Sequence, residues 1–140
     1  MTLRTAAPAL VVLLCAAALA ACGSSSSGPP KTLSLSGEQV PVSQVTTAYT
    51  QMCSIAKQAQ TNVAATVSPF ANTESGLNLL ATVLNKDHAQ DSQRVLSALT
   101  SFTADIGKQP PPSGTAADAN NLLGTAKQGL IDLKITPPAC

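Results

Sequence analysis

Residues 42–63 read VSQVTTAYTQMCSIAKQAQTNV, and their apolar side chains recur every three or four positions. The recurring positions are Val42, Val45, Tyr49, Met52, Ala56, Ala59 and Val63. Because an α-helix completes one turn in about 3.6 residues, this spacing aligns the apolar side chains on one face. The sequence therefore predicts a first amphipathic helix within residues 42–67, with Tyr49 in the core rather than at a ligand site.

A second stretch with the helical period runs from Glu74 to Gly107. Its apolar positions fall into two groups, separated by the polar segment NKDHAQDSQR at 85–94. We expect one long helix, kinked or straight; the alternative is a break near Asp87, which would then cap a new helix. Residues 68–76 (SPFANTESG) are expected to form the connection before it, because proline disfavours helical geometry in the residue that precedes it.

The last helical pattern has its apolar stripe at residues 119–133 and follows the helix-breaking segment QPPPSG at 109–114. The chain then leaves through ITPPAC at 135–140, where two prolines favour an extended tail. No stretch alternates long enough to predict a sheet, since LSLS at 33–36 is too short to found one. The sequence thus predicts an all-α fold within residues 42–140: a small antiparallel bundle of three helices, or four if the middle helix breaks.

The N-terminal residues 1–21 have the three zones of a secretory signal peptide. A short start carries Arg4, an almost wholly apolar run covers residues 6–21, and small side chains stand at its end. A helix that spans the hydrocarbon layer needs about 20 apolar residues, and this run is shorter. We therefore expect residues 1–21 to be removed on export rather than to remain as a membrane span.

The apolar run ends in LAAC at 19–22, which resembles the lipobox of bacterial lipoproteins. The resemblance implies that Cys22 carries a fatty acyl chain such as palmitate and becomes the first residue of the mature protein. The alternative is an ordinary A-x-A cleavage site followed by a cysteine without lipid. Residues 22–41, which include GSSSSGPP, are expected to be a flexible linker. Such a linker before an Ala/Thr-rich body is similar to small lipoproteins of high-GC Gram-positive bacteria.

Two cysteines, Cys53 and Cys140, remain after signal removal and lipidation. Outside the membrane the milieu permits disulfides, so an even pair in an exported domain favours one bridge. An extended tail of about six residues reaches about 20 Å, enough to return from the last helix to the middle of the first. We expect a Cys53–Cys140 disulfide; the alternative is two free thiols, with Cys53 as a small buried hydrophobe.

The charge balance argues against several classes of partner. Of the eight basic and seven acidic side chains, only Arg4 precedes Cys22, so the mature chain carries seven of each. Nucleic-acid binding needs a stripe of basic side chains, and binding to anionic lipid headgroups needs a basic cluster. The sequence has neither. One tyrosine and two phenylalanines also supply too few aromatic rings for a stacking platform. We expect no nucleic-acid partner.

One polar cluster suggests chemistry, because His88, the single histidine, lies beside Asp87 and close to Asp91. On a helix these residues share a face. Such an arrangement would suit a general base that a carboxylate orients, or a partial metal site. The same spacing is common on solvated helix faces, which is the interpretation we favour. Zinc needs more ligands, and P-loop, GxGxxG and GxSxG motifs are absent. We therefore predict no metal, no cofactor and no catalytic residue.

Together these features predict an exported lipoprotein on the extracytoplasmic face of the cell membrane, anchored through Cys22. Its helical domain is expected to be a non-enzymatic module that binds an envelope protein or an apolar ligand. The alternative is a small enzyme or metal binder that uses His88 with Asp87 and Asp91. A third interpretation is a purely structural or stress-related envelope lipoprotein.

Overall fold

The computed structural model describes residue 28 and residues 30–140. The predicted signal peptide at residues 1–21 and the predicted lipidation of Cys22 therefore lie outside the described residues. Within the described part, no helix is both long enough and apolar enough to cross a membrane.

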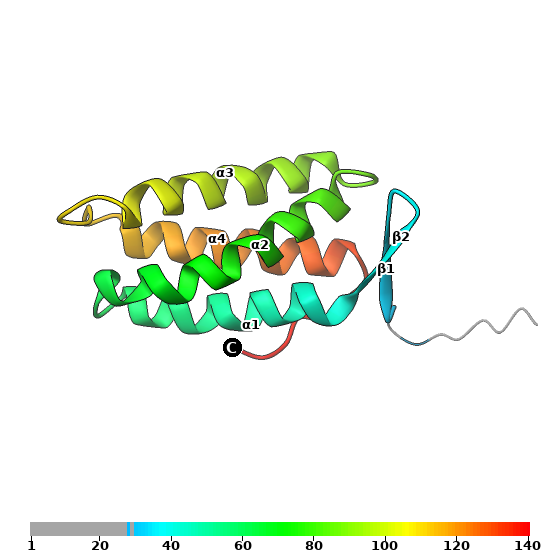
Figure 1. Ribbon diagram of the computed structural model, residues 1–140, viewed down its shortest axis with the longest axis horizontal. Coiled ribbons are helices and arrows are strands. Elements are labelled where there is room, and N and C mark those ends of the chain that lie inside the picture. Colours follow the sequence, from blue (N-terminus) through cyan, green and yellow to red (C-terminus); the bar gives the residue numbers. More distant parts are fainter. Residues whose placement is uncertain (1–27, 29) are drawn as a thin grey trace, which may run out of the picture.

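The described chain folds into a bundle whose helices are α1 (Val42–Ala59), α2 (Val67–Leu84), α3 (Ala89–Ile106) and α4 (Thr115–Asp132). Each helix packs on the next one along the chain, and α4 closes the ring against α1 (Figure 1). Neighbouring helices run antiparallel because short connections join them. The predicted all-α antiparallel bundle is confirmed, and the four-helix alternative is the correct one.

The single helix that we expected over residues 74–107 is wrong, because the chain turns back at residues 85–88. This segment, NKDH, carries no apolar side chain to bury. On either side of it, by contrast, Leu84 and Val95 are fully buried. Reversal at the polar segment lets both apolar faces meet in one core, which a straight helix would keep apart.

The start of α3 also differs from the predicted cap. The N-cap position is His88 rather than Asp87, and no side chain forms a cap hydrogen bond there. The turn is fastened instead by Ser92, whose buried hydroxyl donates to the carbonyl oxygen of Ala81 at 2.7 Å. This bond ties the first turn of α3 to the end of α2.

The connection predicted at residues 68–76 is wrong as well, since these residues belong to α2. Pro69 is the third residue of that helix, where backbone N–H groups have no intrahelical partner and proline is tolerated. The chain reverses earlier, in a 3₁₀ turn, η1 (Val63–Thr66). The side chain of Asn62 begins this turn by accepting a hydrogen bond from the N–H of Ala65 at 3.3 Å.

A β-hairpin precedes α1, where we expected residues 22–41 to be a flexible linker. Strand β1 (Thr32–Leu35) pairs antiparallel with β2 (Glu38–Pro41). The two residues between the strands have φ of 48° and 90°, the left-handed geometry that two-residue hairpin turns prefer. Leu33 and Val40 face each other and are buried in the core, so packing against the end of the bundle stabilises this short sheet (Figure 1).

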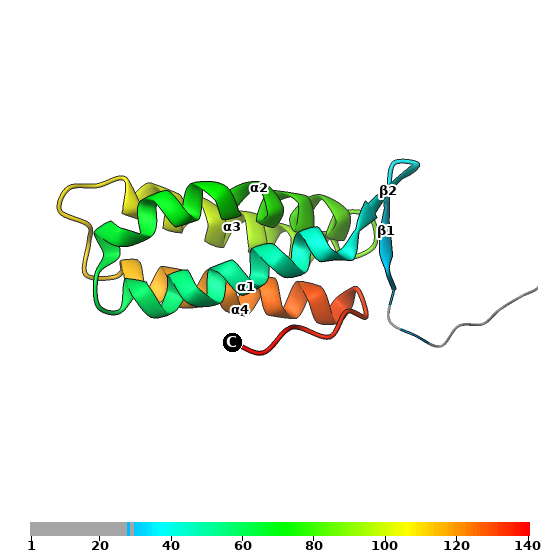
Figure 2. The same cartoon turned by 60° about the horizontal axis from the view of Figure 1, so that its bottom comes forward.

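A disulfide joins Cys53 on α1 to Cys140 in the C-terminal tail, which confirms the predicted bridge. The two Cα atoms are 5.4 Å apart, the usual separation for a disulfide. The tail leaves α4 and runs back beside α1 (Figure 2), and on the way it buries the side chain of Ile135. Nζ of Lys57 donates to the backbone oxygen of Cys140 at 2.6 Å, which adds a polar contact to the covalent one.

Tyr49 lies in the core next to this tail, as its place on the apolar stripe predicts, and is only 2% exposed. Its hydroxyl lies 3.4 Å from Sγ of Cys140. Because a disulfide sulfur carries no proton, the hydroxyl is the donor. Burial raises the pKa of Tyr49, so the phenol keeps the proton that it donates.

Candidate functional site

The predicted cluster of His88, Asp87 and Asp91 does not form a hydrogen-bonded centre. His88 holds the turn through its backbone, since its N–H donates to the carbonyl oxygen of Leu84 at 2.7 Å. The carboxylate of Asp91 accepts instead from Arg94, with 3.1 Å between Oδ1 and the guanidinium nitrogen. Asp87 is exposed in the turn. Among the described residues, no group of three or more His, Cys, Asp or Glu side chains is gathered closely enough to hold a metal ion.

A polar groove follows the seam between α3 and α4. It extends from Gln90 to Ser101 on α3 and from Asn120 to Gln128 on α4, and we call it the α3/α4 groove. Two adjoining hollows of about 570 and 320 Å³ make it up, and they share the side chain of Arg94. At a rise of 1.5 Å per residue along α3, the groove is about 16 Å long.

The walls of this groove are rich in carboxamide side chains. These are Gln90, Gln93, Asn120, Asn121 and Gln128. Each carboxamide offers two N–H donors and one oxygen acceptor. The hydroxyls of serine and threonine line part of the remaining wall, so both helices contribute hydrogen-bond donors and acceptors to the groove.

The lining of the groove also contains two small residues, Ala98 and Gly124. A Cβ atom added to Gly124 would find no other heavy atom within 4 Å, so helix packing does not require a glycine there. A glycine in the interior of a helix is less stable than alanine by about 0.5–1 kcal/mol. At this point α4 contributes no side chain to the lining of the groove.

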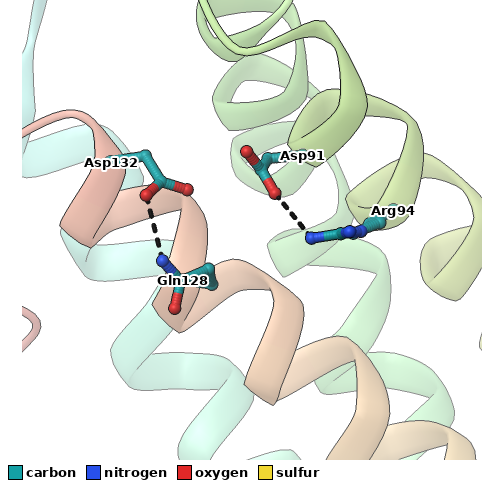
Figure 3. A network of polar contacts seen from close by, with 4 residues as sticks. All are labelled: Asp91, Arg94, Gln128 and Asp132. Carbon is teal, nitrogen blue, oxygen red and sulfur yellow. Dashed lines mark hydrogen bonds and ion pairs between the residues drawn. The ribbon is translucent and has the colours of Figure 1, made fainter.

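Four polar side chains lie at one end of the α3/α4 seam, where α3 begins and α4 ends, and three of them line the groove (Figure 3). Arg94 pairs with Asp91 on α3, and Nε2 of Gln128 donates to Oδ1 of Asp132 at 2.9 Å on α4. The second oxygen of Asp132, Oδ2, points toward Asp91 across the seam. This oxygen is buried and has no hydrogen-bond partner within the described part of the chain. Leaving a buried charged acceptor without a donor costs stability.

The charges of these four side chains do not cancel. Asp91 and Asp132 contribute two carboxylates against the single guanidinium of Arg94. Arg94 has 65% of its side chain exposed while Asp91 has 21%, so the guanidinium reaches into solvent and the carboxylate stays nearer the seam. The exposed carboxamides of the groove walls can hydrogen-bond to neutral polar groups.

A second groove of about 610 Å³ lies between α1 and α2, and its lining includes Ala48 and Gly76. A Cβ atom on Gly76 would lie 2.5 Å from Cβ of Ala48, so close helix packing explains this glycine. No such contact explains Gly124 in the α3/α4 groove. The α3/α4 groove, which also has more carboxamide side chains, is the stronger candidate site.

Two carboxylates meet at the opposite end of the same seam, Asp105 in the last turn of α3 and Asp118 in the first turn of α4. Lys108 donates to Oδ1 of Asp105 at 2.7 Å, and this hydrogen bond lowers the pKa of Asp105. Partial desolvation, followed by the neighbouring Asp105, raises the pKa of Asp118. The two groups therefore titrate apart, and Asp118 takes up its proton first as the pH falls.

Sequence analysis did not single out Asn121, Gly124, Gln128 or Asp132. The available signal was a polar stripe on each helix, with residues three or four positions apart. Every solvated helix face carries such a stripe. Which two stripes adjoin depends on the order of the helices around the bundle, and the hydrophobic period does not specify that order.

Comparison with protein-family models, with curated proteins and with solved structures finds no match to this chain. The function is therefore argued from the residues and the geometry described above.

Proposed function

We propose that the chain is an exported lipoprotein, held on the extracytoplasmic face of the cell membrane by a lipid on Cys22. Its helical bundle is a non-enzymatic binding module. The structural observation that carries the proposal is the Cys53–Cys140 disulfide, because such bonds persist mainly in oxidising compartments outside the cytosol. The LAAC end of the N-terminal apolar run supplies the attachment site. The hairpin of β1 and β2 joins the linker firmly to one end of the bundle.

The α3/α4 groove supports binding rather than catalysis. In the described residues it gathers hydrogen-bonding side chains, without a nucleophile held beside a base. The alternative of a small enzyme or metal binder at His88 has weaker support, because the carboxylate of Asp91 is engaged by Arg94. The polar walls favour an envelope protein as partner over an apolar ligand.

Replacing Cys22 by alanine tests the anchor. We expect Cys22→Ala to move from the membrane fraction to the medium and to lose incorporated palmitate, because the thiol that would accept the acyl chain is gone. Cell fractionation, immunoblotting and labelled palmitate measure both effects. A Cys22→Ala protein that remains in the membrane and still incorporates palmitate would sink the proposal.

Cys15→Ala is the matched control, since Cys15 lies within the apolar run and is expected to leave with the signal peptide. This variant should keep both the membrane location and the palmitate label. Loss of the label in both variants would mean that export itself had failed, and a pulse-chase measurement of signal cleavage separates that outcome from loss of the lipid site.

A further inference from the structure

We propose that residues 136–140 form a redox-released strap. A dithiol reductant opens the Cys53–Cys140 bridge in the folded protein, the strap lifts, and Tyr49 becomes exposed while the bundle keeps its fold. This inference goes beyond the proposed anchor and binding module and depends on neither. It follows from how little holds the strap apart from its bridge, from what the strap covers, and from the different burial of the two cysteines.

The strap is held by little besides the disulfide. Two of its residues are prolines, which have no backbone N–H, and no backbone hydrogen bond joins residues 136–140 to the rest of the described chain. All residues of the strap are exposed or half-buried, so none of them belongs to the core. Its polar contacts with the described chain are both formed by Cys140, one to Lys57 and one to a tyrosine hydroxyl. Cleavage of the S–S bond therefore leaves the strap free to lift.

The chain just before the strap is bound more firmly. Ile135 is only 4% exposed, and its N–H donates to the carbonyl oxygen of Leu130 at 2.9 Å. The N–H of Lys134 donates to the carbonyl oxygen of Ile131 at 2.9 Å. The strap therefore pivots after Ile135, and its opening takes no core residue out of the bundle. Such local opening costs less free energy than global unfolding, because few buried contacts are broken.

The strap runs beside α1 and seals one patch of it (Figure 2). Tyr49 is only 2% exposed, and its hydroxyl donates to Sγ of Cys140. Cys53, about one helical turn further along α1, is 4% exposed. Once the strap lifts, the hydroxyl of Tyr49 loses this acceptor and bonds to water instead. Opening thus turns a sealed patch of α1 into an accessible phenol beside a free thiol.

The chemical step is a thiol–disulfide exchange with the dithiol. One thiolate of the reductant attacks Sγ of Cys140, the S–S bond breaks, and its electron pair leaves with Sγ of Cys53, which takes a proton from water. The second thiolate of the reductant then attacks the sulfur of the first. The reductant leaves as an internal disulfide, and Cys140 is released as a thiolate that is protonated in turn. Two electrons and two protons pass from the dithiol to the protein.

Burial decides which of the two sulfurs is attacked. Cys53 is buried in the middle of α1, whereas Cys140 is an exposed residue on a segment that can lift. The O–H group of Tyr49 also draws electron density from Sγ of Cys140, which favours a nucleophile at that sulfur. A monothiol should therefore form its mixed disulfide on Cys140 and leave Cys53 as the free thiol.

Tyr49 itself supplies the readout, because it is the single tyrosine of a chain without tryptophan. The full chain, purified in a nonionic detergent, is reduced with dithiothreitol at room temperature and freed of reductant without oxygen. Ultraviolet titration should show that the pKa of Tyr49 falls toward the ordinary value on reduction, because the burial that raises it ends. Iodide should quench the tyrosine fluorescence of the reduced protein and not that of the oxidised protein. Far-ultraviolet circular dichroism should stay unchanged.

Two variants separate the bridge from the polar contact. Cys140→Ser should show the exposed tyrosine without any reductant, because it has no bridge. Lys57→Met is the matched control, since it removes a polar contact of the strap and keeps the bridge. In this variant Tyr49 should stay protected from iodide until dithiothreitol is added.

The rate of reduction separates opening of the strap from global unfolding. Local opening exposes little surface, so the rate with dithiothreitol should not change with urea below the unfolding transition. A brief exposure to glutathione, followed by alkylation and peptide mapping, should place the mixed disulfide on Cys140.

Several results would overturn the inference. A reduction rate that rises with urea along the full slope of global unfolding would show that the bundle must unfold before the bridge opens. Loss of helical circular dichroism on reduction would show that the bridge holds the whole fold rather than a strap. An unchanged tyrosine titration in Cys140→Ser, or a mixed disulfide on Cys53, would contradict opening from the strap side. The Cys22→Ala fractionation is independent of every one of these results.

Discussion

Loss of the Cys53–Cys140 disulfide should destabilise the domain by about 4.6 kcal/mol. The bridge connects residues that are 87 positions apart in the sequence. In the chain-entropy treatment, closing a loop of this length lowers the entropy of the unfolded chain by about 15 cal/mol/K, which gives that free energy at 25 °C. Because small domains are stable by only about 5–15 kcal/mol in total, this single bond supplies a large share.

The docked tail adds a second contribution. Once Cys140 is released, Ile135 can leave the core, and full burial of such a side chain stabilises by about 1.5–3 kcal/mol. The backbone contact to Lys57 and the acceptor of the Tyr49 hydroxyl are lost with it. The chain-entropy value is therefore a lower bound if the tail detaches, and it is the full effect if Ile135 stays in place.

Cys140→Ser, compared with wild type in thermal melts with and without reductant, measures these terms. For a domain of this size, about 4.6 kcal/mol corresponds to a fall in melting temperature of about 20 °C. Reductant should lower the melting temperature of the wild type to that of the variant and leave the melting temperature of the variant unchanged. Lys57→Met is the matched control, because it removes one tail contact and keeps the bridge, and should cost no more than about 1 kcal/mol. A variant that melts with the wild type, or two free thiols in the mass spectrum of the unreduced mature protein, would refute this reasoning.

Two further predictions concern helix packing and charge. Gly124→Ala should raise the unfolding free energy by about 0.5–1 kcal/mol, because its Cβ meets open space. Gly76→Ala should lower the unfolding free energy by about 1–3 kcal/mol, because its Cβ collides with that of Ala48. Urea denaturation measures both changes, and a higher unfolding free energy in both variants would contradict the packing argument. Asp118→Asn should raise the melting temperature near about pH 7 and leave it unchanged near about pH 3. The raised pKa makes ionised Asp118 unfavourable in the folded state, and this penalty begins to fall as the pH drops through the folded-state pKa and is gone below the unfolded-state pKa. An equal shift at both pH values would show that the charge of Asp118 is not the cause.

The bundle itself could be predicted because its helices carry regular apolar stripes. Val45, Tyr49 and Met52 recur at the helical period in the sequence, and all three are buried in the structure. The disulfide could be predicted for a different reason. The predicted signal removal and lipidation would leave only two cysteines, and the prolines before Cys140 kept the tail free to return to α1.

The helix boundaries could not be predicted from local rules, because those rules depend on position within the helix. Proline disfavours a helix interior, yet Pro69 stands in the first turn, where it is tolerated. The polar segment at residues 85–88 was compatible with a solvated helix and with a turn. Only the packing of both flanking faces into one core decides for the turn. The hairpin was missed because Leu33 and Val40 become buried only through contact with the finished bundle.

The covalent strap and the candidate site occupy different sides of the bundle. The tail lies beside α1 and is bound to it through Cys53, and the hairpin covers one end of the bundle (Figures 1 and 2). The α3/α4 groove lies on the seam opposite that of α1 and α2, and its lining includes no residue of the described tail. Rigid helices therefore present the exposed polar side chains of the groove while other parts of the chain fix the fold. Because β1 is the first described element and lies at one end of the bundle, the proposed lipid would hold the bundle by that end (Figure 1).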